Sequence, residues 1–178
     1  MAITEKQNLG PYSAAGNSAP RMVKRKLAAS QGIYMAGCPF QMNNSGLLKR
    51  TATSDGTEDQ IQYIAAAGVA AEQAASTEIY VYVVSINDLW QAHADTSGTD
   101  VAATQALIGN EYGITVSTTA GQIGFVSVDV ANANAVLHVE DIWPNVCPSD
   151  RNFGSTSDTP GILIFRFLQA AIDGEVAA

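Results

Sequence analysis

EIYVYVVSI, residues 78–86, is the stretch that decides the fold. It is rich in β-branched and aromatic residues, which favour strands because they pack well on a pleated surface. The sequence therefore predicts a strand here, in a central position of a sheet. A second stretch, GILIFRFL at residues 161–168, alternates Leu163, Phe165 and Phe167 with their neighbours. This period of two is typical of a strand with two different faces.

Further strand patterns recur along the chain and are separated by turn residues. They are GIYMAGCPF, MNNSGLLKRT, IQYIAAAGVAAE, GITVSTT, IGFVSVDV and AVLHVEDIW, while DLWQAHA fits either a strand or a short turn of helix. Many short strands with little helix are typical of β-barrels and β-sandwiches. We therefore predict a mainly β fold, a compact β-barrel or sandwich with one or two short helices and an extended N-terminal arm.

Local signals add detail to this prediction. Asn44 and Gly46 indicate a hairpin turn, and the small residues of IAAAGVAAE would let another backbone approach closely. The clearest helix is expected at residues 101–108, capped by Thr99 or Asp100, with Gly109 in the left-handed position after its end.

Positive charge is concentrated near the N-terminus. RMVKRKL, residues 21–27, holds four of the nine cations of a chain whose net charge is -8. Residues 1–50 carry a net charge of +6 and residues 51–178 one of -14. This asymmetry indicates that the N-terminal segment meets an anionic partner. The predicted partner-binding residues are Arg21, Lys24, Arg25 and Lys26.

The first residues also differ from the rest in composition. They contain Gly, Pro, Ser and Ala without an apolar period of 2 or 3.6, which is typical of an extended segment. We therefore predict a basic N-terminal arm over residues 1–31, disordered when alone, and a β-barrel domain over residues 32–178.

Composition and spacing argue against several classes of protein. The N-terminus lacks the pattern of a secretory signal, and the longest apolar run, residues 63–71, is about half of what a membrane-spanning helix needs. The cysteines Cys38 and Cys147 and the histidines His93 and His138 are isolated, so we expect reduced, half-buried thiols and no zinc site. The acidic cluster Asp55, Glu58 and Asp59 matches no calcium loop and is interpreted as solvated.

Catalytic motifs are missing from the sequence. It contains no GxSxG, HExxH, GxGxxG or GxxxxGKS pattern. A Cys147 nucleophile served by His138 and Asp141 is conceivable, but alternation makes His138 an ordinary strand residue and Cys147 lies between Val146 and Pro148. We predict no catalytic, cofactor-binding or metal-binding residues, no cofactor and no enzymatic activity.

Several segments resemble one known family. GIYMAGCPFQMNNSGLLKRTATSDGTEDQIQYIAAAGVAAEQA, ALIGNEYGITVST and GQIGFVSVDVANANAVLHVEDI look like the barrel of the capsid decoration, or cement, proteins of tailed bacteriophages. The resemblance spans about residues 32–170, through short motifs. It implies a virion structural protein on the capsid surface, with the major capsid protein and further copies of the chain as partners. A trimer is favoured over a dimer, with no nucleic acid and no membrane. The basic arm would clasp a neighbouring acidic subunit.

Other interpretations of the same residues stay open. The basic segment could be a solubilising tail, or each cation could neutralise a DNA phosphate. The protein could be another virion component, from the tail or neck. It could also be a barrel that binds a small ligand or carbohydrate, with stacking residues among the following. These are Trp90, Trp143, Tyr80 and Tyr82.

Overall fold

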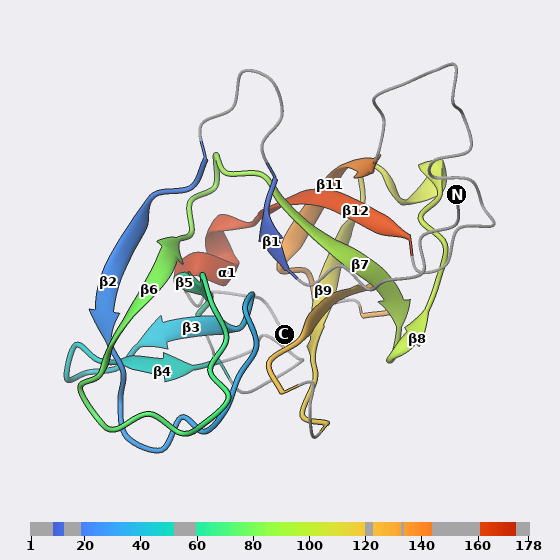
Figure 1. The fold of residues 1–178 in the computed structure, drawn as a ribbon. Coiled ribbons are helices and arrows are strands. Elements are labelled where there is room, and N and C mark those ends of the chain that lie inside the picture. Colours follow the sequence, from blue (N-terminus) through green and yellow to red (C-terminus); the bar gives the residue numbers. More distant parts are fainter. Residues whose placement is uncertain are drawn as a thin grey trace.

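Strands dominate the structure. The computed structural model describes residues 9–12, 19–51, 60–119, 123–132, 134–143 and 161–173. Within these ranges the chain forms a closed β-barrel and a second, five-stranded sheet (Figure 1). The prediction of a mainly β fold with a barrel is confirmed.

The barrel is a closed ring of five strands in the order β7–β10–β9–β11–β12, because β12 pairs again with β7. Its members are β7 (Trp90–Thr96), β9 (Glu111–Val116), β10 (Val126–Asp129), β11 (Leu137–Trp143) and β12 (Ile162–Phe167). Only the β7–β10 pairing is parallel in this ring. Two short strands, β1 (Gly10–Pro11) and β8 (Thr99–Asp100), also pair with β7.

Alternate residues of the barrel strands fill its interior. The apolar set recognised at residues 161–168, Leu163, Phe165 and Phe167, belongs to the barrel core, as do Trp90 and Val128. The rings of Trp90 and Phe167 lie 5.8 Å apart in an edge-to-face arrangement. Burial of this apolar surface is the main force that stabilises the barrel.

The second sheet has the strand order β2–β6–β5–β3–β4. Its members are β2 (Met22–Lys26), β3 (Pro39–Met42), β4 (Leu48–Arg50), β5 (Tyr63–Ala65) and β6 (Glu78–Val83). β6 pairs with β2 on one side and β5 on the other, so the central position predicted for this strand is confirmed. A parallel bridge between Leu27 and Leu48, both fully buried, joins the two outer strands.

A shared core connects the sheet to the barrel. Ile64 and Val84 belong to the same buried cluster as the barrel interior, and the Tyr82 ring lies 6.2 Å from that of Trp90. The short helix α1 (Gln169–Asp173), which follows β12, lies beside β5 (Figure 1). There the carbonyl of Ala171 accepts a hydrogen bond of 3.0 Å from the backbone N–H of Ile61.

The expected free arm is wrong for residues 22–27. Residues 22–26 form β2, which pairs with β6 over its whole length, and Leu27 directly after it is completely buried. The free arm was predicted because lysine and arginine dominate the composition of this stretch. Edge strands tolerate these residues on their solvent side, while Val23 opposes the buried Val81 on the other side. Residues 1–8 and 13–18 lie outside the described residues.

This placement predicts that trypsin will cut the free protein slowly between Arg21 and Lys26. Cleavage requires an extended chain free of the sheet, and β2 must separate from β6 before it can enter the protease. Leu27→Ala is the matched variant, because it removes the buried anchor of β2 and typically costs about 2–5 kcal/mol. Digestion followed by mass spectrometry should show faster cleavage in this variant. Rapid cleavage of the unmodified chain at these sites would restore the free-arm interpretation.

The helix expected at residues 101–108 is shorter than predicted. Only a 3-10 turn, η1 (Gln105–Leu107), forms there, and Thr99 and Asp100 pair with β7 and do not cap a helix. The cause is the turn at Ser97 and Gly98, whose φ angles of 51° and 88° suit a tight hairpin between β7 and β8. Gly109 has the predicted left-handed conformation, with φ of 80°.

Two other local predictions are confirmed. The hairpin of β3 and β4 turns at Asn43 to Gly46, where the Asn43 side chain accepts hydrogen bonds from the N–H groups of Ser45 and Leu47. The small residues after β5 do allow a close approach. A Cβ atom on Gly68 would lie 2.9 Å from the carbonyl oxygen of Tyr34.

Candidate partner-binding surface

Strand alternation divides the four predicted cations between the two faces of β2. Lys24 and Lys26 are exposed on one face with Met22, whereas Arg25 is half-buried on the other. Arg21 is exposed just before the strand, and its carbonyl accepts a hydrogen bond of 2.8 Å from Val83 N–H. The predicted residues are therefore neighbours, but they do not form a single patch.

The exposed side of β2 continues onto β6. Lys24 lies directly opposite Tyr80, and its ammonium nitrogen sits 5.0 Å from the centre of the Tyr80 ring. Met22 and Tyr80 are each 52% exposed, which is high for large apolar side chains. We call this surface, made of Met22, Lys24, Lys26 and Tyr80, the β2–β6 face. Exposed tyrosine and methionine side chains are enriched at protein–protein interfaces.

Arg25 has a structural role. Its guanidinium carbon lies 5.7 Å from the centre of the Tyr63 ring, and one of its N–H groups donates to the carbonyl of Lys24 at 3.1 Å. These contacts hold the side chain against the sheet, on the side away from the β2–β6 face. Arg25 is therefore less available to a partner than the sequence suggested.

The lysines of the β2–β6 face have no carboxylate partner within the described ranges. The ion pairs found there join His93 to Asp100, His138 to Glu111, and Arg166 to Glu140. Glu78 lies opposite Lys26 in the strand register but forms no ion pair with it. The charge of both lysines is thus free to attract an anionic surface.

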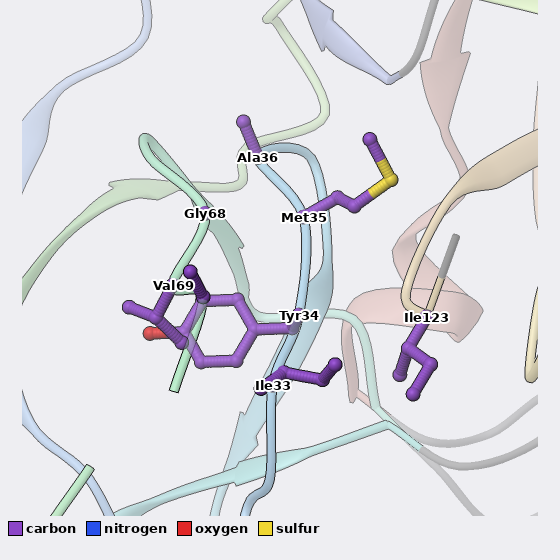
Figure 2. Close-up of a pocket in the computed structure, with 8 residues that line it drawn as sticks. Ile33, Tyr34, Met35, Ala36, Gly68, Val69 and Ile123 are labelled. Carbon is purple, nitrogen blue, oxygen red and sulfur yellow. The ribbon is translucent and has the colours of Figure 1, made fainter. Parts of the chain in front are cut away.

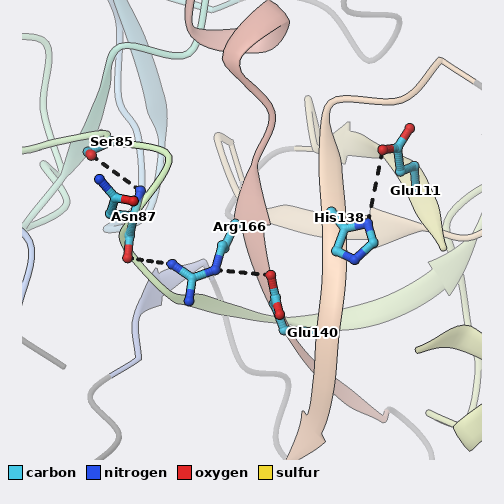
Figure 3. A network of polar contacts seen from close by, with 6 residues as sticks. All are labelled: Ser85, Asn87, Glu111, His138, Glu140 and Arg166. Carbon is cyan, nitrogen blue, oxygen red and sulfur yellow. Dashed lines mark hydrogen bonds and ion pairs between the residues drawn. The ribbon is translucent and has the colours of Figure 1, made fainter. Parts of the chain in front are cut away.

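Of the conceivable catalytic group Cys147, His138 and Asp141, the structure describes only the histidine and the aspartate. His138 Nδ1 lies 4.0 Å from Glu111 Oε1 (Figure 3). One carboxylate oxygen of Asp141 accepts the N–H of Ile142. In the same region Arg166 donates to Glu140 at 3.0 Å and to the carbonyl of Asn87 at 2.6 Å. These contacts tie β12 to β11 and to the β6–β7 connection. Cys147, like the acidic cluster at residues 55–59, lies outside the described residues.

Cys38 is a free thiol, as predicted, but it is more deeply buried than expected. It is completely buried and unpaired, and burial raises its pKa to about 12, with a smaller opposing effect from Arg50. Burial, with a further contribution from Cys38, likewise raises the pKa of Tyr34 to about 12. Both groups stay neutral near pH 7 and are therefore unsuited to nucleophilic or acid–base chemistry.

An apolar groove of about 490 Å³ lies where the 33–36 segment meets the segment after β5. Its lining consists of Ile33, Tyr34, Met35, Ala36, Gly68, Val69, Ala70 and Ile123. The Tyr34 ring extends toward Val69, and Met35 leaves the opposite side of the same segment (Figure 2). Of the stacking residues predicted for a ligand-binding barrel, Trp90, Tyr80 and Tyr82 do not line this groove, and Trp90 is fully buried in the core. The side chain of Trp143 lies outside the described residues.

Two negative findings apply to the described part of the chain alone. It holds no group of three or more His, Cys, Asp or Glu side chains suited to a metal ion. It also contains no helix with the length and apolar character needed to cross a membrane.

No protein-family model and no curated protein matches this chain. The resemblance to capsid decoration proteins therefore stays a prediction from short motifs.

Sequence reasoning found the cations but missed their neighbours. Met22 and Tyr80 complete the β2–β6 face, although Tyr80 was considered only as a stacking residue for a small ligand. The alternation of Met22, Lys24 and Lys26 was the signal that could have revealed the face, because it has the period of two of a strand.

Proposed function

We propose that this protein is a virion structural protein of the decoration, or cement, type, which binds and stabilises the outer surface of a phage head. The observation that carries the proposal is the β2–β6 face. It presents two large apolar side chains beside two lysines that have no carboxylate partner among the described residues, on a chain whose net charge is -8. Such a face suits a contact with an acidic protein surface.

Two separate interactions contribute to this contact. Met22 and Tyr80 supply apolar area that leaves water on binding, and Lys24 and Lys26 supply attraction to carboxylates of the major capsid protein. In this arrangement the acidic residues of the barrel face the solvent around the head. Their like charge disfavours aggregation of decorated heads. Because β2 is part of a sheet, this contact is a preformed surface and loses little conformational freedom on binding.

Stabilisation follows from preferential binding to the assembled shell. A protein that binds assembled heads but not free subunits shifts the equilibrium toward the assembled state. Decorated heads are therefore expected to rupture at a higher temperature than bare heads, measured by release of packaged DNA during heating. Equal rupture temperatures at saturating protein would contradict the cement function.

Variants of the β2–β6 face test the surface itself. Tyr80→Ala is expected to weaken binding to bare heads about tenfold or more, as for a central aromatic anchor, measured by co-sedimentation. Lys24→Ser with Lys26→Ser should weaken it several-fold at low salt and much less at high salt. Lys49→Ser is the matched control, because Lys49 is an exposed cation of β4 that is not one of the residues of this face. Unchanged binding of Tyr80→Ala, together with a loss for Lys49→Ser as large as that for the double lysine variant, would point to overall charge and away from the face.

A further inference from the structure

A row of three aspartates crosses the barrel wall outside its apolar core. In the strand register Asp95 of β7 lies opposite Asp129 of β10 on one side and opposite Asp100 of β8 on the other. Directly opposed residues of adjacent strands share a face, and like charges in such positions repel each other. Asp95 and Asp129 are nevertheless only 3% and 7% exposed. A buried arrangement of this kind needs a compensating positive charge or a bound proton.

Of the three aspartates, Asp95 lines a polar pocket of about 280 Å³. The pocket is lined by His93, Asp95, Gly98, Thr115, Val116, Ser117, Thr118, Thr119, Phe125 and Ser127. Hydroxyl groups therefore make up much of its wall, and the rings of Phe125 and His93 lie 4.9 Å apart on one side of it. No lysine or arginine is among the described residues that line it.

The carboxylates of Asp95 and Asp129 differ in the hydrogen bonds that they accept. Asp129 accepts hydrogen bonds from the Thr115 hydroxyl and from the N–H groups of Ser97 and Ala131, at 3.0–3.2 Å. Asp95 accepts the Ser127 hydroxyl at Oδ2, while its buried Oδ1 has no hydrogen-bond partner in the described structure. Burial raises the pKa of Asp95, and the charges of Asp129 and Asp100 raise it further, against the lowering effects of Ser127 and the Gly98 backbone. Asp95 thus has the Ser127 hydroxyl and the Gly98 backbone as stabilising neighbours, but its Oδ1 atom still lacks a hydrogen-bond partner within the described structure.

The chemistry of the pocket favours an organic cation over a metal ion. Divalent metals need several oxygen ligands around one point, and the described residues provide no such group. The volume of about 280 Å³ also far exceeds that of a single ion or water molecule. An alkylammonium group needs only a few acceptors, which Asp95 and the hydroxyls supply, and its charge and stem are favoured by an aromatic ring such as Phe125.

We propose that this pocket is a binding site for a primary ammonium group, with Asp95 as its counter-ion. The ligand is either a free alkylamine or polyamine, or the side chain of a lysine on a partner protein. Asp95 pairs with the ammonium, the hydroxyls of the pocket accept its remaining hydrogens, and Phe125 contacts the alkyl stem.

Calorimetric titration of the full chain tests this site. The probes are pentylamine, putrescine and Nα-acetyl-lysine methylamide, with 1-pentanol as the neutral match to pentylamine and calcium chloride as the metal control. We expect saturable binding of at least one amine and no binding of pentanol or calcium. Binding of putrescine alone identifies a free polyamine as the ligand type, and binding of the lysine derivative identifies a partner side chain. Saturable binding of calcium alone, or no saturable binding of any amine, overturns the proposal.

Variants then locate the site. Asp95→Asn should lower amine affinity at least tenfold, while its amide can keep the contact with Ser127 and so preserve the fold. Asp173→Asn, on the exposed end of α1, is the matched control for the loss of one negative charge. Thr118→Phe provides a second test from an exposed position, because the larger side chain should obstruct the pocket without altering buried groups. Unchanged amine affinity in both Asp95→Asn and Thr118→Phe, with thermal unfolding intact, would place binding elsewhere and overturn the proposal.

Discussion

Trp90→Ala is expected to lower the free energy of unfolding by about 3–5 kcal/mol, the range found when a buried aromatic side chain is truncated. Trp90 is completely buried, and its ring contacts Phe167 of the barrel and Tyr82 of the second sheet. The substitution therefore leaves a cavity where the two parts share their core. Urea unfolding at equilibrium measures the change.

Trp90→Phe is the control for this experiment. The indole N–H of Trp90 is buried without a hydrogen-bond partner in the described structure, so phenylalanine removes an unsatisfied donor while it keeps most of the apolar contact. We expect a loss well below that of the alanine variant. A loss under about 1 kcal/mol for Trp90→Ala would contradict the shared core, since truncations at buried aromatic positions exceed this value.

Gly161→Ala is expected to destabilise the protein by about 3 kcal/mol or more, at the upper end of the effect of overpacking. A Cβ atom at this position would lie 1.9 Å from the backbone nitrogen of Ala103. The backbone cannot easily withdraw, because Gly161 donates to the carbonyl of Val101 at 2.9 Å and accepts from Ala94 N–H at 2.8 Å. These bonds lie where β12 meets β7, so their loss should weaken the closure of the barrel.

Two further variants separate crowding from backbone strain. Gly46→Ala has open space around it and a φ of 73°, so it measures the cost of a left-handed conformation alone, about 1 kcal/mol. Ala103→Gly combined with Gly161→Ala should give little rescue, because the closest clash is with a backbone atom. Full rescue by Ala103→Gly, or equal effects of the two single glycine substitutions as followed by thermal unfolding, would contradict the crowding explanation.

The elements that sequence reasoning predicted well are those in which composition and period agree. β6 is rich in β-branched and aromatic residues and β12 alternates aromatic and aliphatic residues, and both were recognised as strands. The hairpin of β3 and β4 was found because Asn and Gly occupy its turn. β2 was missed because its solvent-side lysines suggested an unfolded arm, while only Val23 and Leu27 marked its buried side.

The candidate sites were harder to predict than the fold. The β2–β6 face joins residues almost 60 positions apart in the sequence, Met22 and Tyr80, and only the strand register brings them together. The polar pocket depends in the same way on Asp95 and Asp129, which sit in different strands and form no local motif. Single-sequence patterns report the period of one element, so they cannot show which side chains from distant strands become neighbours.

The order of the strands along the chain has a consequence for synthesis on the ribosome. Every strand of the second sheet lies within residues 22–83, whereas the barrel closes only when β12, residues 162–167, reaches β7. Folding of nascent chains generally proceeds from the N-terminus, so the second sheet can assemble before most of the barrel has been synthesised. During that interval the apolar surface around Ile61, Ile64 and Val84, which later joins the barrel core, has no cover. Chains that stall before residue 161 should therefore be the species that chaperones retain and that aggregate first.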